Sequence, residues 1–337
     1  MLLNNNEYLK IMESIKSEIK SAQYKAAVSV NRELIMLYYN IGCVINAHKI
    51  WGNKFIENLA ADIRMEFPGV TGYSVRNLKY MAKFAAKFSD IEIVQAVLAQ
   101  LTWYHNIALM DKVADHDAYI WYAQKSIENG WSRNVLVHQI ESGLYERQAV
   151  SQKVSNFEKL LASPQSELAT QTMKDPYVFD FIPFKEDMVE RDIEQALVKD
   201  ITSLLMELGT GFAFLGNQYH LNVGGDDFYI DLLFYNLNLR CYVVIELKTG
   251  EFKPEYAGQL NFYLSAVDGI LKKDMDNPSI GLLLCKSKND LVAEYALKDM
   301  SKPIGVSEYK ITNNLPQELE NQLPSIEDIQ KRIKKTN

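Results

Sequence analysis

The chain has 337 residues, which is enough for two domains, and its 47% hydrophobic and 23% charged residues are ordinary for a soluble globular protein. The net charge of −7 excludes a uniformly basic nucleic-acid-binding surface, so any such surface must be local. No apolar run approaches the length of a membrane span, and the first residues lack the apolar core of a signal peptide. The three cysteines show no metal-ligand spacing and favour a reduced, cytoplasmic protein.

The first 150 residues are predicted to form an all-helical domain, because apolar residues recur at spacings of three and four. Pro68-Gly69 ends the second helix, and Ser74 is placed to cap the third. A short helix, a glycine turn and a basic helix are typical of a helix-turn-helix, so we expect a helix-turn-helix-like domain that recognises nucleic acid or a protein partner. The expected helices cover residues 7–48, 54–67, 74–88, 92–113, 116–128 and 133–141.

The third of these helices carries a stripe of positive charge and no acidic residue. Arg76, Lys79, Lys83 and Lys87 follow one another at spacings of three, four and four, which places them on one face. One interpretation is a helix whose basic side chains contact DNA phosphates. The alternative is the solvent-exposed face of a bundle helix, which is the commoner role of such a stripe.

The remainder of the chain is predicted to form a linker, an α/β domain and a tail. Residues 151–180 contain loop-forming prolines and serines and are expected to be the linker, and residues 316–337 are the expected tail, with a short amphipathic helix at 327–335. Residues 181–315 lie between them and predict a mixed sheet flanked by helices. The elements expected there are a helix (186–208), strands (212–223, 227–235 and 240–248), a helix from Pro254, a strand (280–285), a helix (289–300) and a strand (304–309).

Three charged residues lie in two very apolar strands of this domain. Glu246 and Lys248 share one face of the strand 240–248, whose other face is apolar, and they lie roughly 7 Å apart along it. Asp231 lies in the preceding strand, opposite the face expected for Phe228, Ile230, Leu232 and Phe234. A hairpin of suitable register brings Asp231 beside Glu246. Such a Glu-x-Lys pair is usually a solvated ion pair, but charges in apolar strands are costly to bury without a function.

Two carboxylates and a lysine suit metal-assisted phosphodiester hydrolysis. Carboxylate oxygens hold Mg²⁺, for which Mn²⁺ can substitute, and the metal activates water and stabilises charge on the phosphate. Lys248 is then expected to orient the attacking water or to stabilise the transition state. Gln259 and Tyr263 lie four residues apart on one face of the following helix, where an amide and a phenol can bind a nucleotide or phosphate beside the metal.

These motifs resemble those of a known family. Asp231, Glu246 and Lys248 match the signature of the PDDEXK, or restriction-endonuclease-like, superfamily, and Gln259 with Tyr263 resembles the Gln-x-x-x-Tyr motif of its RecB-type branch. The strings IDLLFYNLNLRCYVVIELKTGEFKPEYAGQLNFYLSAVD, NPSIGLLLCKSKN and IENGWSRNVLVHQIESGLYERQ are similar to those of the bacterial YhcG-type nucleases. The proline that precedes the aspartate in the signature is Ile230 here.

The resemblance implies further metal ligands and leaves other functions open. It implies that the backbone carbonyl of Leu247 is a ligand, and that an acid on the first helix of the domain, best matched by Glu194, joins the metal site. A single site acting on duplex DNA favours a homodimer. The alternatives are a non-cleaving nucleic-acid-binding or protein-binding module with a nuclease fold, and a scaffold whose cleavage is gated by a partner.

Overall fold

The computed structural model describes residues 5–48, 53–183 and 188–311, and the chain divides into two compact units, residues 1–140 and 141–337. The tail predicted for residues 316–337, with its helix at 327–335, lies outside the described residues, and the domain boundaries predicted from the sequence stay a prediction. Within the described part of the chain, none of the helices has both the length and the apolar character needed to cross a membrane.

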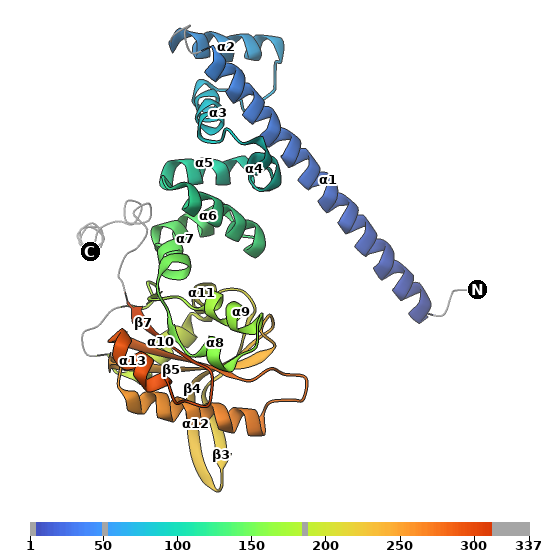
Figure 1. The fold of residues 1–337 in the computed structure, drawn as a ribbon. Helices are drawn as coiled ribbons and strands as arrows, with labels where there is room; N and C mark the ends of the chain where they lie inside the picture. Colours follow the sequence, from blue (N-terminus) through green and yellow to red (C-terminus); the bar gives the residue numbers. More distant parts are fainter. Residues whose placement is uncertain (1–4, 49–52, 184–187, 312–337) are drawn as a thin grey trace, which may run out of the picture. The chain divides into compact units, whose positions relative to one another are not determined.

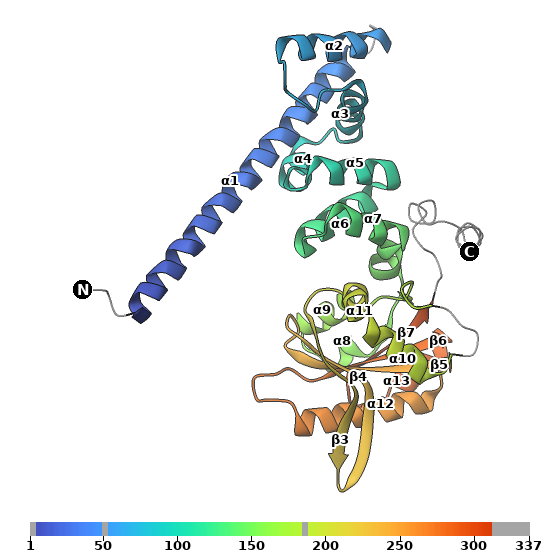
Figure 2. The ribbon, with the colours of Figure 1, turned by 180° about the vertical axis from the view of Figure 1, so that it is seen from behind.

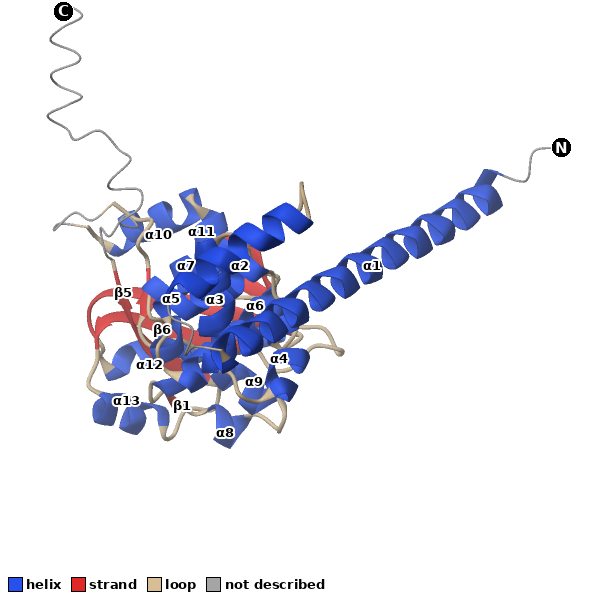
Figure 3. Cartoon of the chain, turned by 90° about the horizontal axis from the view of Figure 1, so that it is seen from above, coloured by secondary structure: helices blue, strands red, loops and turns tan. Residues whose placement is uncertain are grey.

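The N-terminal unit is all-helical, as predicted (Figure 1). Its first helix runs unbroken from Asn5 to Ala47 (Figure 3). Ser74 caps α3 by accepting a hydrogen bond from the backbone N–H of Asn77, as its position predicted. The helices are α1 (Asn5–Ala47), α2 (Asn53–Glu66), α3 (Val75–Lys87), α4 (Ile91–Ala96), η2 (Leu98–Gln100), α5 (Trp103–Lys112), α6 (His116–Asn129) and α7 (Arg133–Glu141).

Aromatic side chains form the core of this unit. The Trp103 ring lies 4.9 Å from the Tyr38 ring and 5.5 Å from the Phe84 ring, and so joins α5 to α1 and α3. Leu78, Met81 and Phe84 are fully buried on α3, so this helix is held by its apolar face. The basic stripe lies on the remainder of its surface.

The C-terminal unit is built around one mixed sheet. The strand order is β1-β7-β6-β5-β4-β3, with β2 added beside β7. The β3, β4 and β5 strands pair antiparallel, whereas β5, β6 and β7 pair parallel. The elements are η3 (Glu146–Val150), β1 (Val154–Ser155), α8 (Phe157–Leu160), α9 (Gln165–Thr172), β2 (Tyr177–Val178), α10 (Glu190–Lys199), α11 (Ile201–Leu208), β3 (Phe212–Val223), β4 (Asp226–Asn236), β5 (Cys241–Glu251), α12 (Pro254–Ile270), β6 (Ile280–Ser287), α13 (Asp290–Leu297) and β7 (Ile304–Lys310).

Helices cover both faces of the sheet, which gives three layers (Figure 2). Apolar residues of α8 to α11 pack on one face against Leu232, Val243 and Ile245. Apolar residues of α12 and α13 pack on the other face against Val244 and Leu283. The central strands are therefore buried on both faces, which explains why their sequences are almost continuously apolar.

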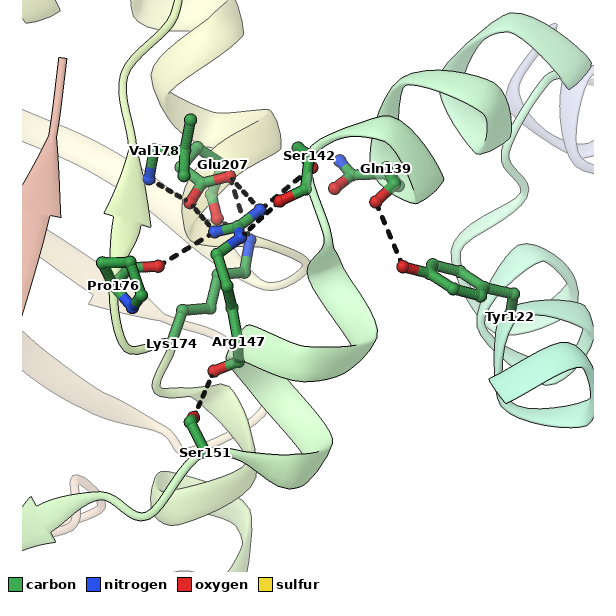
Figure 4. Close-up of polar contacts among 9 residues, drawn as sticks. All are labelled: Tyr122, Gln139, Ser142, Arg147, Ser151, Lys174, Pro176, Val178 and Glu207. Atoms are coloured by element: carbon green, nitrogen blue, oxygen red, sulfur yellow. Dashed lines mark hydrogen bonds and ion pairs between the residues drawn. The ribbon is translucent and has the colours of Figure 1, made fainter. Parts of the chain in front are cut away.

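A buried cluster of charged residues holds the first segment of the C-terminal unit against α11 (Figure 4). Arg147 lies on η3, and its guanidinium donates to the Glu207 carboxylate of α11 at 2.6 Å; both side chains are buried. The same guanidinium donates to the Ser142 and Pro176 carbonyls, and the Lys174 Nζ lies 3.5 Å from Glu207. These contacts satisfy each charge, as burial demands.

Three local features differ from the sequence-based expectation. The helix expected at 186–208 is split at Asp200, whose side chain caps α11 by accepting from the Ser203 N–H. Residues within the range expected to be a linker form β1, α8, α9 and β2. Ile230 packs with the α12 layer, whereas Leu232 and Phe234 pack on the opposite face, so the predicted face shared by Phe228, Ile230, Leu232 and Phe234 is wrong. The backbone leaves the extended conformation at Gln218, which lies across from Asp231 between the pairs Asn217–Leu232 and Tyr219–Ile230.

Candidate active site

The β4–β5 hairpin brings the two predicted carboxylates together. Its register places Leu232 opposite Ile245, so the next residues outward are Asp231 and Glu246. The backbone N–H of Asp231 donates to Glu246 Oε1 at 3.2 Å, and the Leu247 N–H donates to Asp231 Oδ2 at 2.9 Å. Each strand thus supplies a backbone donor to the carboxylate of the other, and the two acids are held side by side.

Lys248 lies between carboxylates from two elements. Its Nζ is 3.7 Å from Glu246 Oε2 and 3.4 Å from Glu190 Oε2 at the start of α10. It also lies 5.4 Å from the centre of the Tyr256 ring on α12, at a cation–π distance. The residue is 8% exposed, so its ammonium is held by these neighbours rather than by bulk water.

Glu194 reaches the same group of residues from α10. It is 2% exposed, and it accepts hydrogen bonds from two amides of β3. Asn217 Nδ2 donates to Glu194 Oε1 at 2.7 Å, and Gln218 Nε2 donates to Oε2 at 2.5 Å and, at 3.3 Å, to Asp231 Oδ1. The acid predicted from the resemblance therefore lies beside Asp231 through a shared amide.

The predicted Gln–Tyr pair also lies at this group. On α12, Gln259 Nε2 donates to the Tyr263 hydroxyl at 2.9 Å. Burial raises the pKa of Tyr263 against the hydrogen bond from Gln259, which lowers it, and the nearby Glu246 and Asp231 carboxylates raise it further. Gln259 is exposed, whereas Tyr263 is buried, so the pair extends from the acids toward the solvent.

The site carries more negative than positive charge. Burial raises the pKa of Glu246 to about 8, and the neighbouring Asp231 charge contributes. Burial also raises the pKa of Asp231, against the hydrogen bond from Leu247 and the charge of Lys248, which lower it. Burial lowers the pKa of Lys248, but Glu246, Asp231 and Glu190 raise it more, so it rises overall. The ammonium thus stays protonated while the acids lack sufficient positive charge.

A hard divalent cation fits this donor chemistry. Asp231, Glu246 and Glu194 provide carboxylate oxygens, and Leu247 provides a nearby backbone carbonyl, which are the ligand types that Mg²⁺ and Mn²⁺ accept. Among residues 5–48, 53–183 and 188–311, no three His, Cys, Asp or Glu side chains form a ready-made metal cluster. In this arrangement Glu194 accepts hydrogen bonds from two amides, and Glu190 pairs with Lys248.

The basic stripe of α3 lies in the N-terminal unit, and its lysines Lys83 and Lys87 make contacts that Arg76 and Lys79 do not make. Lys83 Nζ donates to the Met110 carbonyl at 2.9 Å and pairs with Asp111 at 3.1 Å. Lys87 Nζ donates to the carbonyls of Val113 and Ala114 at 3.2 and 3.1 Å. These two lysines therefore satisfy carbonyls at the end of α5, a common role for basic side chains near a helix C-terminus.

The first turns of α3 present a different surface. Arg76 and Lys79 are exposed, and the Arg76 guanidinium lies 5.7 Å from the centre of the Tyr80 ring. Together with Val75, Lys83 and Asp111 they line an open hollow of about 620 Å³. A positively charged hollow with an aromatic ring combines the two groups that bind phosphates and bases.

Sequence reasoning missed three polar residues of the site. Glu190 lies near the start of the helix expected at 186–208, where an acidic residue is favourable in any case, and nothing in its position indicates that it pairs with Lys248. Asn217 and Gln218 lie in a strand without alternation, and no spacing rule connects them to Glu194. One signal was available, because adjacent amides in the strand beside Asp231 are unusual where β-branched and aromatic residues are preferred.

Comparisons with known proteins agree with this geometry. Residues 170–324 match the model of the YhcG PDDEXK nuclease domain, and residues 14–147 match the DUF1016 N-terminal domain. The chain is 30% identical over 347 residues to the protein named "Putative nuclease YhcG" of Escherichia coli (strain K12), and the match covers 92% of each chain.

Solved structures give weaker matches. A repair endonuclease from Pyrococcus abyssi is 13% identical, with 39% of this chain and 50% of that chain covered and a TM-score of 0.26. A complex of EndoMS with double-stranded DNA is 16% identical, with 40% and 49% covered and a TM-score of 0.27.

Proposed function

Because the chain belongs to the YhcG family of PDDEXK nucleases, we propose that it hydrolyses phosphodiester bonds of DNA with Mg²⁺ as its cation and Mn²⁺ as a substitute. The observation that carries this proposal is the pairing of Asp231 with Glu246. The backbone of each strand holds the carboxylate of the other, and burial raises the pKa of both acids. A divalent cation would supply the positive charge that this pair lacks.

The roles that we assign follow from these contacts. Asp231 and Glu246 would hold the cation, with the Leu247 carbonyl and Glu194 as further ligands. The bound cation activates water and offsets charge on the phosphate. Lys248 is protonated and buried beside Glu246, and we assign it to positioning the attacking water or to stabilising the transition state. Gln259 and Tyr263 would donate hydrogen bonds to the substrate phosphate or base, because both side chains end in donors.

We assign the retention of DNA to the first turns of α3. Arg76 and Lys79 are exposed beside the Tyr80 ring, whereas Lys83 and Lys87 donate to carbonyls at the end of α5. Guanidinium and ammonium groups that are free to reach phosphates supply most non-specific DNA affinity. The surface that we assign to DNA binding therefore belongs to the N-terminal unit, whereas the residues that we assign to catalysis belong to the C-terminal unit.

The experiment that tests the proposal is a cleavage assay with end-labelled single-stranded, duplex and branched DNA. It uses the full chain with Mg²⁺, with Mn²⁺ or with EDTA. We expect cleavage with either metal and none with EDTA, and we expect Lys248→Ala to lose it. Glu294→Gln is the matched control, because it removes an exposed carboxylate of α13. Cleavage in EDTA, or parental cleavage by Lys248→Ala, would contradict the proposal.

One observation favours a second candidate, a nuclease gated by a partner. Lys248 is paired with Glu190 of α10, so the ammonium that we assign to the substrate is held by another residue. A partner or DNA that moves α10 would release it. Binding of Mn²⁺ by the purified chain, with cleavage only after a cell extract is added, would support this candidate.

A further inference from the structure

Gln218 has an unusual backbone for a strand residue. It lies in the middle of β3 with φ 44°, in the left-handed region that favours glycine. Among the described residues only Gln218 and Arg240 share this feature without being glycine, and Arg240 lies in the turn between β4 and β5, where such a conformation is common. A conformation of this kind persists only where the surrounding structure holds it.

The left-handed backbone explains a contact that a regular strand cannot make. Successive side chains of a strand point to opposite faces of the sheet. Asn217 and Gln218 are successive residues, and yet both donate to the Glu194 carboxylate, at 2.7 and 2.5 Å. The change of direction at Gln218 brings both amides to the same side, and the same Nε2 also reaches Asp231 Oδ1 at 3.3 Å.

We infer that Gln218 is a positioning residue that sets where the Asp231 and Glu194 carboxylates present their oxygens to the divalent cation. This inference rests on the proposed function. Glu194 comes from α10 and Asp231 from β4, and two negative charges close enough to share the Gln218 amide repel each other. An amide that donates to both holds them together, and it leaves the other oxygen lone pairs free for a cation.

The test measures Mn²⁺ affinity by titration calorimetry, in the absence of DNA, for the full chain and for the variants Gln218→Gly, Arg240→Gly and Asp231→Asn. Gln218→Gly keeps the backbone conformation and removes the amide, so we expect Mn²⁺ binding to weaken about tenfold, as for other residues that orient metal ligands. Arg240→Gly is the matched control, because it also replaces a left-handed residue by glycine, and we expect it to bind Mn²⁺ as the parent does.

The isosteric variant Gln218→Glu gives a second readout. A glutamate cannot donate to Glu194 or Asp231, and it adds a third negative charge beside them. We expect a lower Tm than that of the parent without cation and a larger rise in Tm when Mn²⁺ is added, because the cation offsets the added charge. A Tm lowered equally with and without Mn²⁺ would show that the side chain at position 218 does not affect the cation site and would overturn the inference.

The outcomes separate this inference from the function on which it rests. Parental Mn²⁺ affinity in Gln218→Gly, with binding lost in Asp231→Asn, would overturn the positioning role and leave the metal site intact. Absence of Mn²⁺ binding in the parent would overturn the proposed metal site and the inference together. If Arg240→Gly binds Mn²⁺ as weakly as Gln218→Gly does, the loss of affinity comes from glycine at a left-handed backbone position. That result would overturn the role of the Gln218 amide.

Discussion

The backbone N–H of Asp231 donates a hydrogen bond to the Glu246 carboxylate at 3.2 Å, and so a half-buried acid and a buried acid from neighbouring strands lie side by side. Each would be costly to ionise there, and together they repel. The nearest compensating charge is Lys248, which Glu190 also attracts.

Asp231→Asn and Glu246→Gln should each lose cation binding and retain the fold. Each substitution keeps the shape of the side chain and removes one negative charge from the site, so affinity for Mn²⁺ should fall at least about tenfold. Calorimetric titration with Mn²⁺ measures this, and far-UV circular dichroism checks the fold. Glu294→Gln should bind as the parent does. Retained Mn²⁺ affinity in both variants would contradict the assignment of these acids as ligands.

Lys248→Ala should separate binding from chemistry. The ammonium is assigned to the transition state rather than to the cation, so its removal should lower kcat by about 10²-fold or more. Mn²⁺ affinity should stay equal to that of the parent or rise, because a positive charge leaves the site. Single-turnover kinetics and calorimetry on the same preparation measure the two quantities. A loss of Mn²⁺ binding that accounts for the loss of rate would refute this role.

Glu246 should make folding stability depend on pH when no divalent cation is present. Its pKa is about 8 in the folded protein against 4.5 for an exposed glutamate. The folded state therefore binds one more proton between these values, and stability falls as pH rises from about 4.5 to about 8. Below about pH 4.5 this contribution of Glu246 to the folding stability is fully present.

Urea unfolding of the parent and Glu246→Gln in EDTA, at about pH 5 and about pH 9, measures this effect. The variant has no proton to lose, so its stability relative to that of the parent should be greater at the higher pH. The difference scales as about 1.4 kcal/mol for each unit of pKa shift. Equal relative stability at both pH values would show that Glu246 is not perturbed.

The basic stripe of α3 should divide into two functions. Arg76→Glu with Lys79→Glu should weaken DNA binding and lower the salt dependence by about two phosphate contacts, with the fold unchanged. Lys87→Met should instead lower Tm, because Lys87 satisfies two carbonyls after α5. Fluorescence anisotropy over a range of salt concentrations, together with thermal unfolding, distinguishes the two. Unchanged DNA affinity in the double variant would make the stripe an ordinary solvent-exposed face.

The Arg147–Glu207 pair should be essential for the C-terminal unit. Both side chains are buried, so Glu207→Ala leaves an uncompensated buried guanidinium and should cost about 3–5 kcal/mol of stability. Replacing both residues by methionine should cost less than Glu207→Ala alone, because the guanidinium is then absent and only Lys174 loses its carboxylate partner. Chemical denaturation of the three proteins measures this. A double variant that is less stable than Glu207→Ala would show that the pair is favourable in itself.

The sequence was sufficient to predict the sheet and the central acids, because both depend on local patterns. Alternation and apolar runs place Glu246 and Lys248 on one face of β5, and the short turn before Cys241 fixes the hairpin. Spacing on a helix likewise brings Gln259 to Tyr263. The resemblance to the PDDEXK family then identified Glu194.

The residues that the sequence did not indicate depend on contacts between distant elements. Gln218 reaches Glu194 because its backbone leaves the extended conformation, which propensity rules for glutamine do not predict. Glu190 meets Lys248 only when α10 packs beside β5. Lys83 and Lys87 were grouped with Arg76 by spacing, but the end of α5 gives them different contacts. Tertiary packing decides each of these cases.

Single-turnover cleavage of end-labelled DNA in Mg²⁺, by the parent and by Asp231→Asn in parallel, tests the central claim most directly. The substrate is the DNA form that the parent cuts fastest, and Glu294→Gln controls for the removal of an acid elsewhere in the unit. The account predicts that the parent and the control cleave at equal rates, and that Asp231→Asn is slower by about 10³-fold or more. Cleavage by Asp231→Asn at the parental rate would show that the Asp231–Glu246 pair is not the catalytic centre.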